Sequence, residues 1–171
     1  VIDSGVHIID LTWYLMGRPE PVSVSANTYE KIGDYDTEGV SRWEALDTDD
    51  LVFDVEDSAA GFIRFDNGAT ISFDVSWAIN GESTGTICKV FGDKAGANVE
   101  PLTIYGEEEN HLVDETPTVG DESNFDNEIR HFLDCVKGEE EPLAPVRDGV
   151  KVQKMLNGIY ESAEAGKEVQ L

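Results

Sequence analysis

Four polar residues recur at helical spacing in the opening stretch of the chain: Asp3, His7, Asp10 and Tyr14. At about 100° per residue they fall within a stripe roughly 60° wide on one face of an α-helix. Apolar residues flank the stripe on both sides, with Ile2, Val6, Ile9, Trp13 and Met16 on one side and Ile8, Leu11 and Leu15 on the other. This pattern predicts that two carboxylates and an imidazole lie in a mostly buried setting, where they are costly unless paired or used in chemistry.

These side chains suit proton transfer to and from a substrate hydroxyl. His7 has an ordinary pKa near neutrality, which is the range that a general base requires. Asp3, one helical turn earlier, can orient the imidazole and stabilise its protonated form. Asp10, on the next turn, can accept hydrogen bonds from neighbouring hydroxyls of a polyol. Simpler roles stay open, since Asp3 suits a helix N-terminus and Asp10 could pair with a basic group. Tyr14 is expected to be a core aromatic and is left out of the site.

Other candidate residues are weaker. The polar stripe could supply three metal ligands, but zinc sites usually recruit further His or Cys, and neither Cys-x-x-Cys nor His-x-x-x-His occurs. We therefore expect no metal site. His111 and His131 are expected to be structural. Trp77 could stack against a sugar, although a role in sheet packing is the simpler interpretation.

The elements that must position the stripe are one helix, a series of strands and two closing helices. The first helix is expected to end at Gly17, with Pro19 and Pro21 blocking its continuation. Strands are expected over residues 22–29 (with Val22, Val24 and Ala26 on one face), 52–55, 59–65, 69–77, 84–91 and 97–105, and a short edge strand at 112–113. Asn67-Gly68 is a strong hairpin signal. Residues 31–50 are acidic and polar and predict a long loop.

Two amphipathic helices close the chain. Ser123 or Asn124 can cap a helix that Gly138 ends, and Asp148 begins another that ends at Gly166. A short last strand is expected at 169–171. The order predicts an α+β fold, with a mostly antiparallel open sheet covered on one face by helices, as one domain over residues 1–171.

Composition excludes several classes of protein. Thirty-six acidic and twelve basic residues give a net charge of −24, which is incompatible with binding nucleic acid and disfavours anionic membranes. No apolar run approaches the ~20 residues of a membrane span, and the opening stretch does not resemble a signal peptide. Cys88 and Cys135 suit reduced thiols packed in the core of a cytoplasmic protein. The acidic runs indicate solvated loops or, as a sharper hypothesis, a surface adapted to high intracellular salt.

The polar stripe is also part of a wider resemblance. Asp3-Ser4-Gly5-Val6-His7-Ile8-Ile9-Asp10 resembles the D-x-G-x-H-x-x-D segment of the Gfo/Idh/MocA oxidoreductases. Further segments resemble the family's sheet and closing helices in the same order, at 55–65, 67–69, 75–77, 91–96, 131–136 and 159–167. The resemblance implies that Asp3 and His7 match the family's catalytic Asp and His, and that Asp10 matches a substrate-binding position.

The resemblance covers only the C-terminal half of a family member. It implies that NAD or NADP binds mainly to an N-terminal Rossmann domain, which also supplies a catalytic Lys; neither a G-x-G-x-x-G motif nor that Lys occurs in this chain. We therefore expect a fragment that is inactive by itself. The full protein is expected to be a cytoplasmic dehydrogenase of a sugar or polyol, forming a homodimer or homotetramer through the open sheet face. A non-catalytic relative that senses sugars or binds a partner is the alternative.

Overall fold

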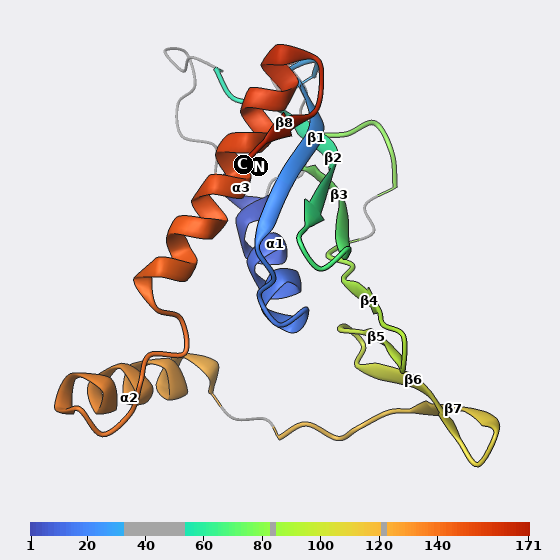
Figure 1. Cartoon of the computed structure of the whole chain (residues 1–171), viewed down its shortest axis with the longest axis vertical. Helices are drawn as coiled ribbons and strands as arrows, with labels where there is room; N and C mark the ends of the chain where they lie inside the picture. Colours follow the sequence, from blue (N-terminus) through green and yellow to red (C-terminus); the bar gives the residue numbers. More distant parts are fainter. Residues whose placement is uncertain (33–53, 83–84, 121–122) are drawn as a thin grey trace. The chain divides into compact units, whose positions relative to one another are not determined.

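The computed structural model of the chain describes residues 1–32, 54–82, 85–120 and 123–171. These residues form two compact units, one of Val1–Ser83 with Lys154–Leu171 and one of Thr84–Gln153. Figure 1 labels the elements of both units. The part of the chain described contains no helix long and apolar enough to cross a membrane.

The first unit is built on a four-stranded antiparallel sheet with the order β3-β2-β1-β8. Its strands are β1 (Pro21–Tyr29), β2 (Ser58–Phe65), β3 (Thr70–Ser76) and β8 (Val169–Gln170). Asn67-Gly68 forms the tight turn of the β2–β3 hairpin, as predicted, and Gly68 takes a φ of +86° there. Only glycine adopts such a φ readily, which explains its place in the turn.

One face of this sheet carries the core of the unit. The strand register places core residues in two cross-strand rows, the buried Val24–Ile63–Ile71 and Ala26–Gly61–Phe73, in which Gly61 is half-buried. Helix α1 (Ser4–Leu15) packs on this face through β3, and the Lys154–Ala165 part of helix α3 (Val146–Ala165) packs on it through β1. Figure 1 shows both helices beside the sheet. The layers thus follow from one apolar sheet face and two helices with apolar stripes.

Two details of β1 differ from a regular alternating strand. The register shifts between Pro21 and Ser23, so Val22 leaves the face on which Val24 and Ala26 lie, and the prediction that all three share a face was wrong. An extra residue in one strand of a pair reverses the alternation in this way. The short strand β8 pairs with β1 only at Ser23 and Val24. Beyond it, the Ala26 N–H of β1 donates a hydrogen bond of 2.9 Å to the buried hydroxyl of Ser162, so this N–H at the edge of the sheet has a partner.

The second unit contains a four-stranded antiparallel sheet with the order β4-β5-β6-β7. Its strands are β4 (Lys89–Phe91), β5 (Gly96–Asn98), β6 (Thr103–Glu108) and β7 (His111–Glu115). The edge strand predicted at 112–113 is confirmed. The strand predicted over 97–105 is instead divided by a turn that contains Pro101, where proline offers no N–H to a ladder. The strand predicted over 84–91 is reduced to β4, and residue 84 lies outside the described residues.

Helix α2 (Asn124–Lys137) agrees closely with its prediction. The Ser123 hydroxyl accepts a hydrogen bond from the Asp126 N–H, and Gly138 ends the helix in the left-handed conformation. Helix α3 begins at Val146, two residues before the predicted start. The predicted α+β class with antiparallel strands is confirmed, and the strands form two sheets. The predicted loop over 31–50 and strand over 52–55 lie mostly outside the described residues; residues 54 and 55 are not in a strand.

Candidate active site

Helix α1 is held in the first unit by one of its apolar flanks. Ile9 and Trp13 are fully buried, and the Trp13 indole N–H donates to the Pro19 carbonyl at 2.7 Å. At the first turn, a Cβ added to Gly5 would lie 3.3 Å from a methyl group of Val75 in β3. A glycine at this position lets the helix approach the strand closely, which gives the Gly of the opening motif a packing role.

The other side of α1 is open to solvent. Asp3, His7, Asp10 and Tyr14 are all exposed in the structure. The prediction that the stripe lies in a mostly buried setting was therefore wrong, and so was the prediction that Tyr14 is a core aromatic. The reason is that only one apolar flank packs on the sheet, while Leu15 at the end of the second flank is exposed. Tyr14 instead lies under the Arg18 guanidinium, 4.7 Å from its ring centroid.

One of the simpler roles for the stripe fits the structure. Asp3 occupies the N-cap position of α1, where its charge suits the helix N-terminus, although its side chain makes no capping hydrogen bond. Within the part of the chain described, neither His7 nor Asp10 makes a hydrogen bond or an ion pair. The structure therefore brings two carboxylates and one imidazole onto one exposed helix face, with hydrogen-bonding groups that the fold itself does not use.

Beside the first turn of α1, Glu56 connects three parts of the first unit. Its Oε1 accepts hydrogen bonds from the Val1 nitrogen and, at 2.9 Å, from the Tyr160 hydroxyl of α3. Burial alone would raise the pKa of Glu56, but hydrogen bonds from the Val1 nitrogen, its own backbone and Tyr160 lower it. Burial, together with the bond to this carboxylate, raises the pKa of Tyr160 to about 12. The pair thus favours an ionised Glu56 and a protonated Tyr160.

The same end of the sheet holds Asp57 and Trp77. The buried Asp57 carboxylate accepts hydrogen bonds from the backbone N–H groups of Lys31 and, at 2.7 Å, Ile32. The Trp77 indole N–H donates to the Glu56 carbonyl at 2.7 Å, and half of its side chain is exposed. The simpler interpretation of Trp77 as a sheet-packing residue therefore does not describe it fully.

A second group of polar side chains lies at the C-terminal end of α2. His131 Nδ1 lies 2.6 Å from Glu140 Oε2, and the Leu143 N–H donates to His131 Nε2 at 3.1 Å. Because Nε2 accepts, the ring proton is on Nδ1 and donates to Glu140. Cys135 Sγ lies 3.5 Å from Nε2, but burial and three nearby carboxylates raise the pKa of this thiol. A thiol that stays protonated is a poor nucleophile, so the group fastens the loop after α2, as expected of a structural His131.

The remaining residues singled out in the sequence, His111 and the two cysteines, show no arrangement that points to catalysis. His111 is exposed in the β6–β7 hairpin, where its Nδ1 lies 2.9 Å from the Glu109 carbonyl. Cys88 is buried and Cys135 half-buried, and both are free thiols. No group of three or more His, Cys, Asp or Glu side chains within the described residues is arranged to hold a metal ion.

The described strands do not form a dinucleotide site. Every strand pair is antiparallel, and no glycine-rich turn leads from a strand into a helix N-terminus in these parts of the chain. A pyrophosphate site of the Rossmann type requires that arrangement. The described residues therefore do not fit NAD or NADP. The candidate residues of this chain are candidates for substrate binding and proton transfer.

Glu56 and Tyr160, which lie beside the first turn of α1, were not identified from the sequence. Tyr160 was expected on the apolar face of the last helix, and Glu56 lies in an acidic segment just before β2. The one available signal was a phenol within an otherwise apolar stripe, because a buried tyrosine hydroxyl usually requires a partner.

Comparison with known proteins places the whole chain in a single family. All of residues 1–171 match the model of the C-terminal α/β domain of the Gfo/Idh/MocA oxidoreductase family. A D-glucoside 3-dehydrogenase of Escherichia coli K12 is 31% identical over 174 residues, which are 100% of this chain and 48% of the relative. The chain thus spans about half the length of this relative.

Solved structures share the fold at lower identity. Levoglucosan dehydrogenase in complex with NADH has a TM-score of 0.77 at 20% identity, covering 98% of this chain and 49% of that one. An aldose–aldose oxidoreductase from Caulobacter crescentus, complexed with glycerol, has a TM-score of 0.69 at 22% identity, covering 98% and 46%. These likenesses extend over both units of the chain.

Proposed function

Because the chain belongs to the Gfo/Idh/MocA oxidoreductases as their C-terminal α/β domain, we propose that it is the substrate-binding half of an NAD(P)-dependent dehydrogenase. The substrate is a sugar or polyol, oxidised at a secondary alcohol. The observation that carries this proposal is the stripe of Asp3, His7 and Asp10, which lies exposed on a well-anchored helix with no partner among the described residues. The D-glucoside 3-dehydrogenase relative supports the sugar class of substrate.

His7 acts as the general acid and base. Oxidation of a secondary alcohol removes a proton from oxygen and a hydride from carbon, and an imidazole within reach of the hydroxyl takes the proton. Asp3, four residues earlier on the same face, orients the imidazole and favours its protonated form. Asp10, three residues later, accepts hydrogen bonds from adjacent substrate hydroxyls. The exposure of all three side chains leaves them accessible to a substrate.

The nicotinamide cofactor, which accepts the hydride, is bound elsewhere in the protein. Antiparallel strands without a glycine-rich turn offer no place for its pyrophosphate in the described residues. Levoglucosan dehydrogenase, about half of which has the same fold as this chain, was solved with NADH, which supports a nicotinamide cofactor for this chain's protein. A second domain that brings NAD or NADP, and the family's Lys, to the α1 stripe completes the site. The chain by itself is therefore inactive.

The open face of the first sheet serves as the contact between subunits of a homodimer or homotetramer, and the protein works in the cytoplasm. This face presents Phe62 with the Arg64 guanidinium 4.8 Å from its ring centroid, and polar side chains of β3 beside them. A mixed aromatic and polar surface of this kind suits a contact between soluble subunits.

The test is a kinetic comparison in the full-length protein that carries this chain. Formation of reduced nicotinamide is followed with NAD and NADP across glucosides, other sugars and cyclitols. We expect His7→Ala to lower kcat/KM by at least about 100-fold while cofactor binding is retained. His111→Ala, which removes another exposed imidazole, is expected to change kcat/KM less than about twofold. Tight sugar binding without turnover, unaffected by the loss of His7, would instead indicate the non-catalytic relative.

A further inference from the structure

We propose that Trp77 is the stacking surface for the sugar ring and that it gives this site its preference for pyranosides. The proposal rests on the function proposed above and adds a substrate-binding residue that the α1 stripe does not contain. Figure 1 shows the end of β3, where Trp77 follows Ser76.

The orientation of Trp77 is held by the main chain of the segment just before β2. Its backbone N–H donates to the Asp57 carbonyl at 3.0 Å, and its indole N–H donates to the Glu56 carbonyl at 2.7 Å. Hydrogen bonds to two adjacent residues hold both the backbone and the ring of Trp77. A ring held in this way loses little conformational entropy when a ligand binds to it.

The Trp77 ring is far more exposed than that of Trp13, the other tryptophan among the described residues. The Trp77 side chain is 53% exposed, whereas that of Trp13 is 1% exposed and forms part of the core. Val55, which precedes the hydrogen-bond acceptor Glu56, and Ile79, two residues after Trp77, are also exposed. Since the indole N–H is already used, the exposed part of Trp77 is its apolar ring, which suits a ligand with an apolar face.

Trp77 and the α1 stripe are anchored to the same residue. The Glu56 carbonyl holds the Trp77 indole, while the Glu56 carboxylate holds the Val1 nitrogen, two residues before Asp3. In addition, Val75, two residues before Trp77, lies beside Gly5 in the first turn of α1. The indole and the start of the stripe therefore belong to one locally connected region.

The chemistry of a pyranose matches the exposed Trp77 ring and the polar stripe of α1. Its C–H groups carry a small positive charge and stack on the negative face of an aromatic ring. Its hydroxyls point outward from the ring edge, where His7 and Asp10 offer a base and an acceptor. A glucoside with one continuous C–H face is the occupant that fits best. A protein segment covering the same apolar residues is the competing occupant, and the test must separate the two.

The experiment uses steady-state kinetics of the full-length protein with methyl glucoside and a linear polyol, for Trp77→Ala, Trp77→Phe and Ile79→Ala. We expect Trp77→Ala to raise KM for the glucoside at least about 10-fold, with kcat and KM for the cofactor changed less than about twofold. Trp77→Phe keeps an aromatic face and is expected to recover most of the affinity. The polyol, which lacks a ring face, is expected to show a smaller change.

The control variant separates stacking from an interface. Ile79→Ala removes a neighbouring exposed side chain and leaves KM for the glucoside unchanged if Trp77 binds sugar. Equal losses of thermal stability or cofactor affinity in Trp77→Ala and Ile79→Ala would assign the patch to a protein contact and overturn the proposal. An unchanged KM in an active Trp77→Ala enzyme would overturn it while the dehydrogenase function stands. A wild-type enzyme that neither binds nor oxidises any sugar would overturn both.

Discussion

The Tyr160 hydroxyl donates a hydrogen bond of 2.9 Å to Glu56 Oε1, joining two residues 104 positions apart in the sequence. The same carboxylate accepts a bond from the Val1 nitrogen, and the Ile2 backbone contacts the Tyr160 hydroxyl. The segment that leads into α1 is thus fastened to both α3 and the start of β2. The pair sets where the first turn of α1, and with it Asp3, begins.

Replacing Tyr160 by phenylalanine is expected to destabilise the first unit. The substitution keeps the ring but removes one hydrogen bond to a charged, half-buried carboxylate, which costs about 1–2 kcal/mol. Urea unfolding of wild type and Tyr160→Phe measures this difference. Tyr29→Phe is the matched control, since Tyr29 is exposed and its hydroxyl makes no hydrogen bond within the described residues; it is expected to change stability by less than about 0.5 kcal/mol. Equal stabilities of the two variants would contradict the role of the Glu56–Tyr160 bond.

The same tyrosine predicts a loss of stability in alkaline solution. Its pKa is raised to about 12 in the folded protein from an ordinary value of 10.0. A raised folded pKa contributes stability that is fully present below pH 10 and is lost as the pH rises toward 12, because the unfolded state releases its proton first. The difference in unfolding free energy between wild type and Tyr160→Phe is therefore expected to shrink over this range. A constant difference would show that Tyr160 titrates normally.

Glu56 predicts the opposite dependence at low pH. In a chain that begins at Val1, the charged amino group of that residue, together with the backbone and Tyr160 hydrogen bonds, lowers the folded pKa of Glu56 from an ordinary 4.5. The contribution of Glu56 to stability is then present above pH 4.5 and is lost as the pH falls through the folded value. Glu56→Gln keeps the shape of the side chain and removes this titration. Chemical unfolding of both proteins from pH 6 downward is expected to show wild type as the more stable at pH 6, with the gap closing below about pH 4.5. A gap that widens in acid would contradict the assigned direction.

Local patterns in the sequence predicted most helices and strands but not how they pack. The helix α2 is bounded by Ser123 and Gly138 as predicted, because capping and left-handed residues act within a few positions of the helix ends. The division of the 97–105 strand at Pro101 had a local signal in the missing N–H of proline, which the prediction did not use. The bounds of a helix or strand were thus predictable where the residues that set them lie within one turn or one hairpin.

The candidate site was predictable in its residues and not in its surroundings. The spacing of Asp3, His7 and Asp10 identified one helix face, but two apolar flanks offered two ways to pack the helix, and periodicity alone does not choose between them. The contact between Glu56 and Tyr160 has no local signature, since it depends on how α3 returns to the sheet. Trp77 was recognised as a possible sugar contact, and only its exposure distinguishes this role from packing.

The packing of α3 on β1 can be tested at a single glycine. A Cβ added to Gly158 would lie 2.5 Å from the Leu171 side chain and 3.1 Å from a methyl group of the fully buried Val24. Gly158→Ala is therefore expected to destabilise the protein by about 1–3 kcal/mol, despite the better helix propensity of alanine. In the same helix, Gly149 has no atom within 4 Å of an added Cβ. Gly149→Ala is expected to stabilise by about 0.5–1 kcal/mol. Thermal unfolding measures the Tm of both variants. A lower Tm for Gly158→Ala and a higher Tm for Gly149→Ala would support the close approach of α3 to β1, and a higher Tm for both would contradict it.

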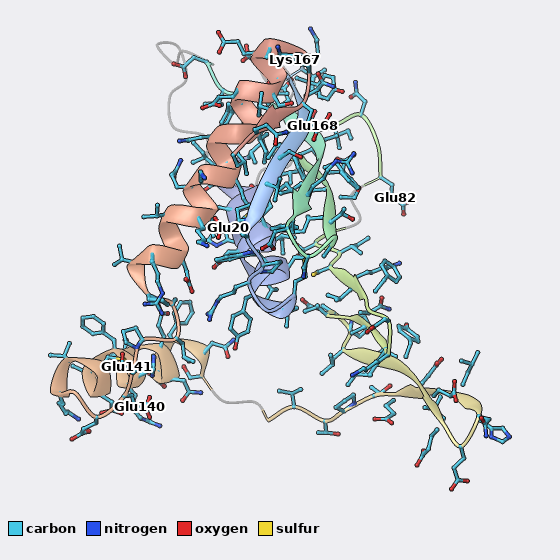
Figure 2. All side chains as sticks on the ribbon, viewed as in Figure 1. Glu20, Glu82, Glu140, Glu141, Lys167 and Glu168 are labelled. Carbon is cyan, nitrogen blue, oxygen red and sulfur yellow. The ribbon has the colours of Figure 1, made fainter. Side chains whose placement is uncertain are left out.

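The acidic surface predicts a strong dependence of stability on salt. The sequence has thirty-six acidic residues and only twelve basic ones, and acidic side chains such as Glu139, Glu140 and Glu141 after α2 are exposed. Figure 2 labels Glu140 and Glu141 among them. Their repulsion acts over about 10 Å at 0.1 M salt and only about 3 Å at 1 M. We therefore expect Tm to rise by at least about 4 °C between these concentrations of KCl, which corresponds to roughly 1 kcal/mol for a domain of this size. Potassium chloride is preferred to a sulfate, because sulfate also strengthens apolar burial. A variant with Glu107, Glu108 and Glu109 changed to Gln removes three exposed carboxylates that make no ion pair within the described residues, and it is expected to need less salt for the same Tm. Full stability in low salt, with no gain on adding KCl, would contradict the hypothesis that the surface is adapted to a high-salt interior.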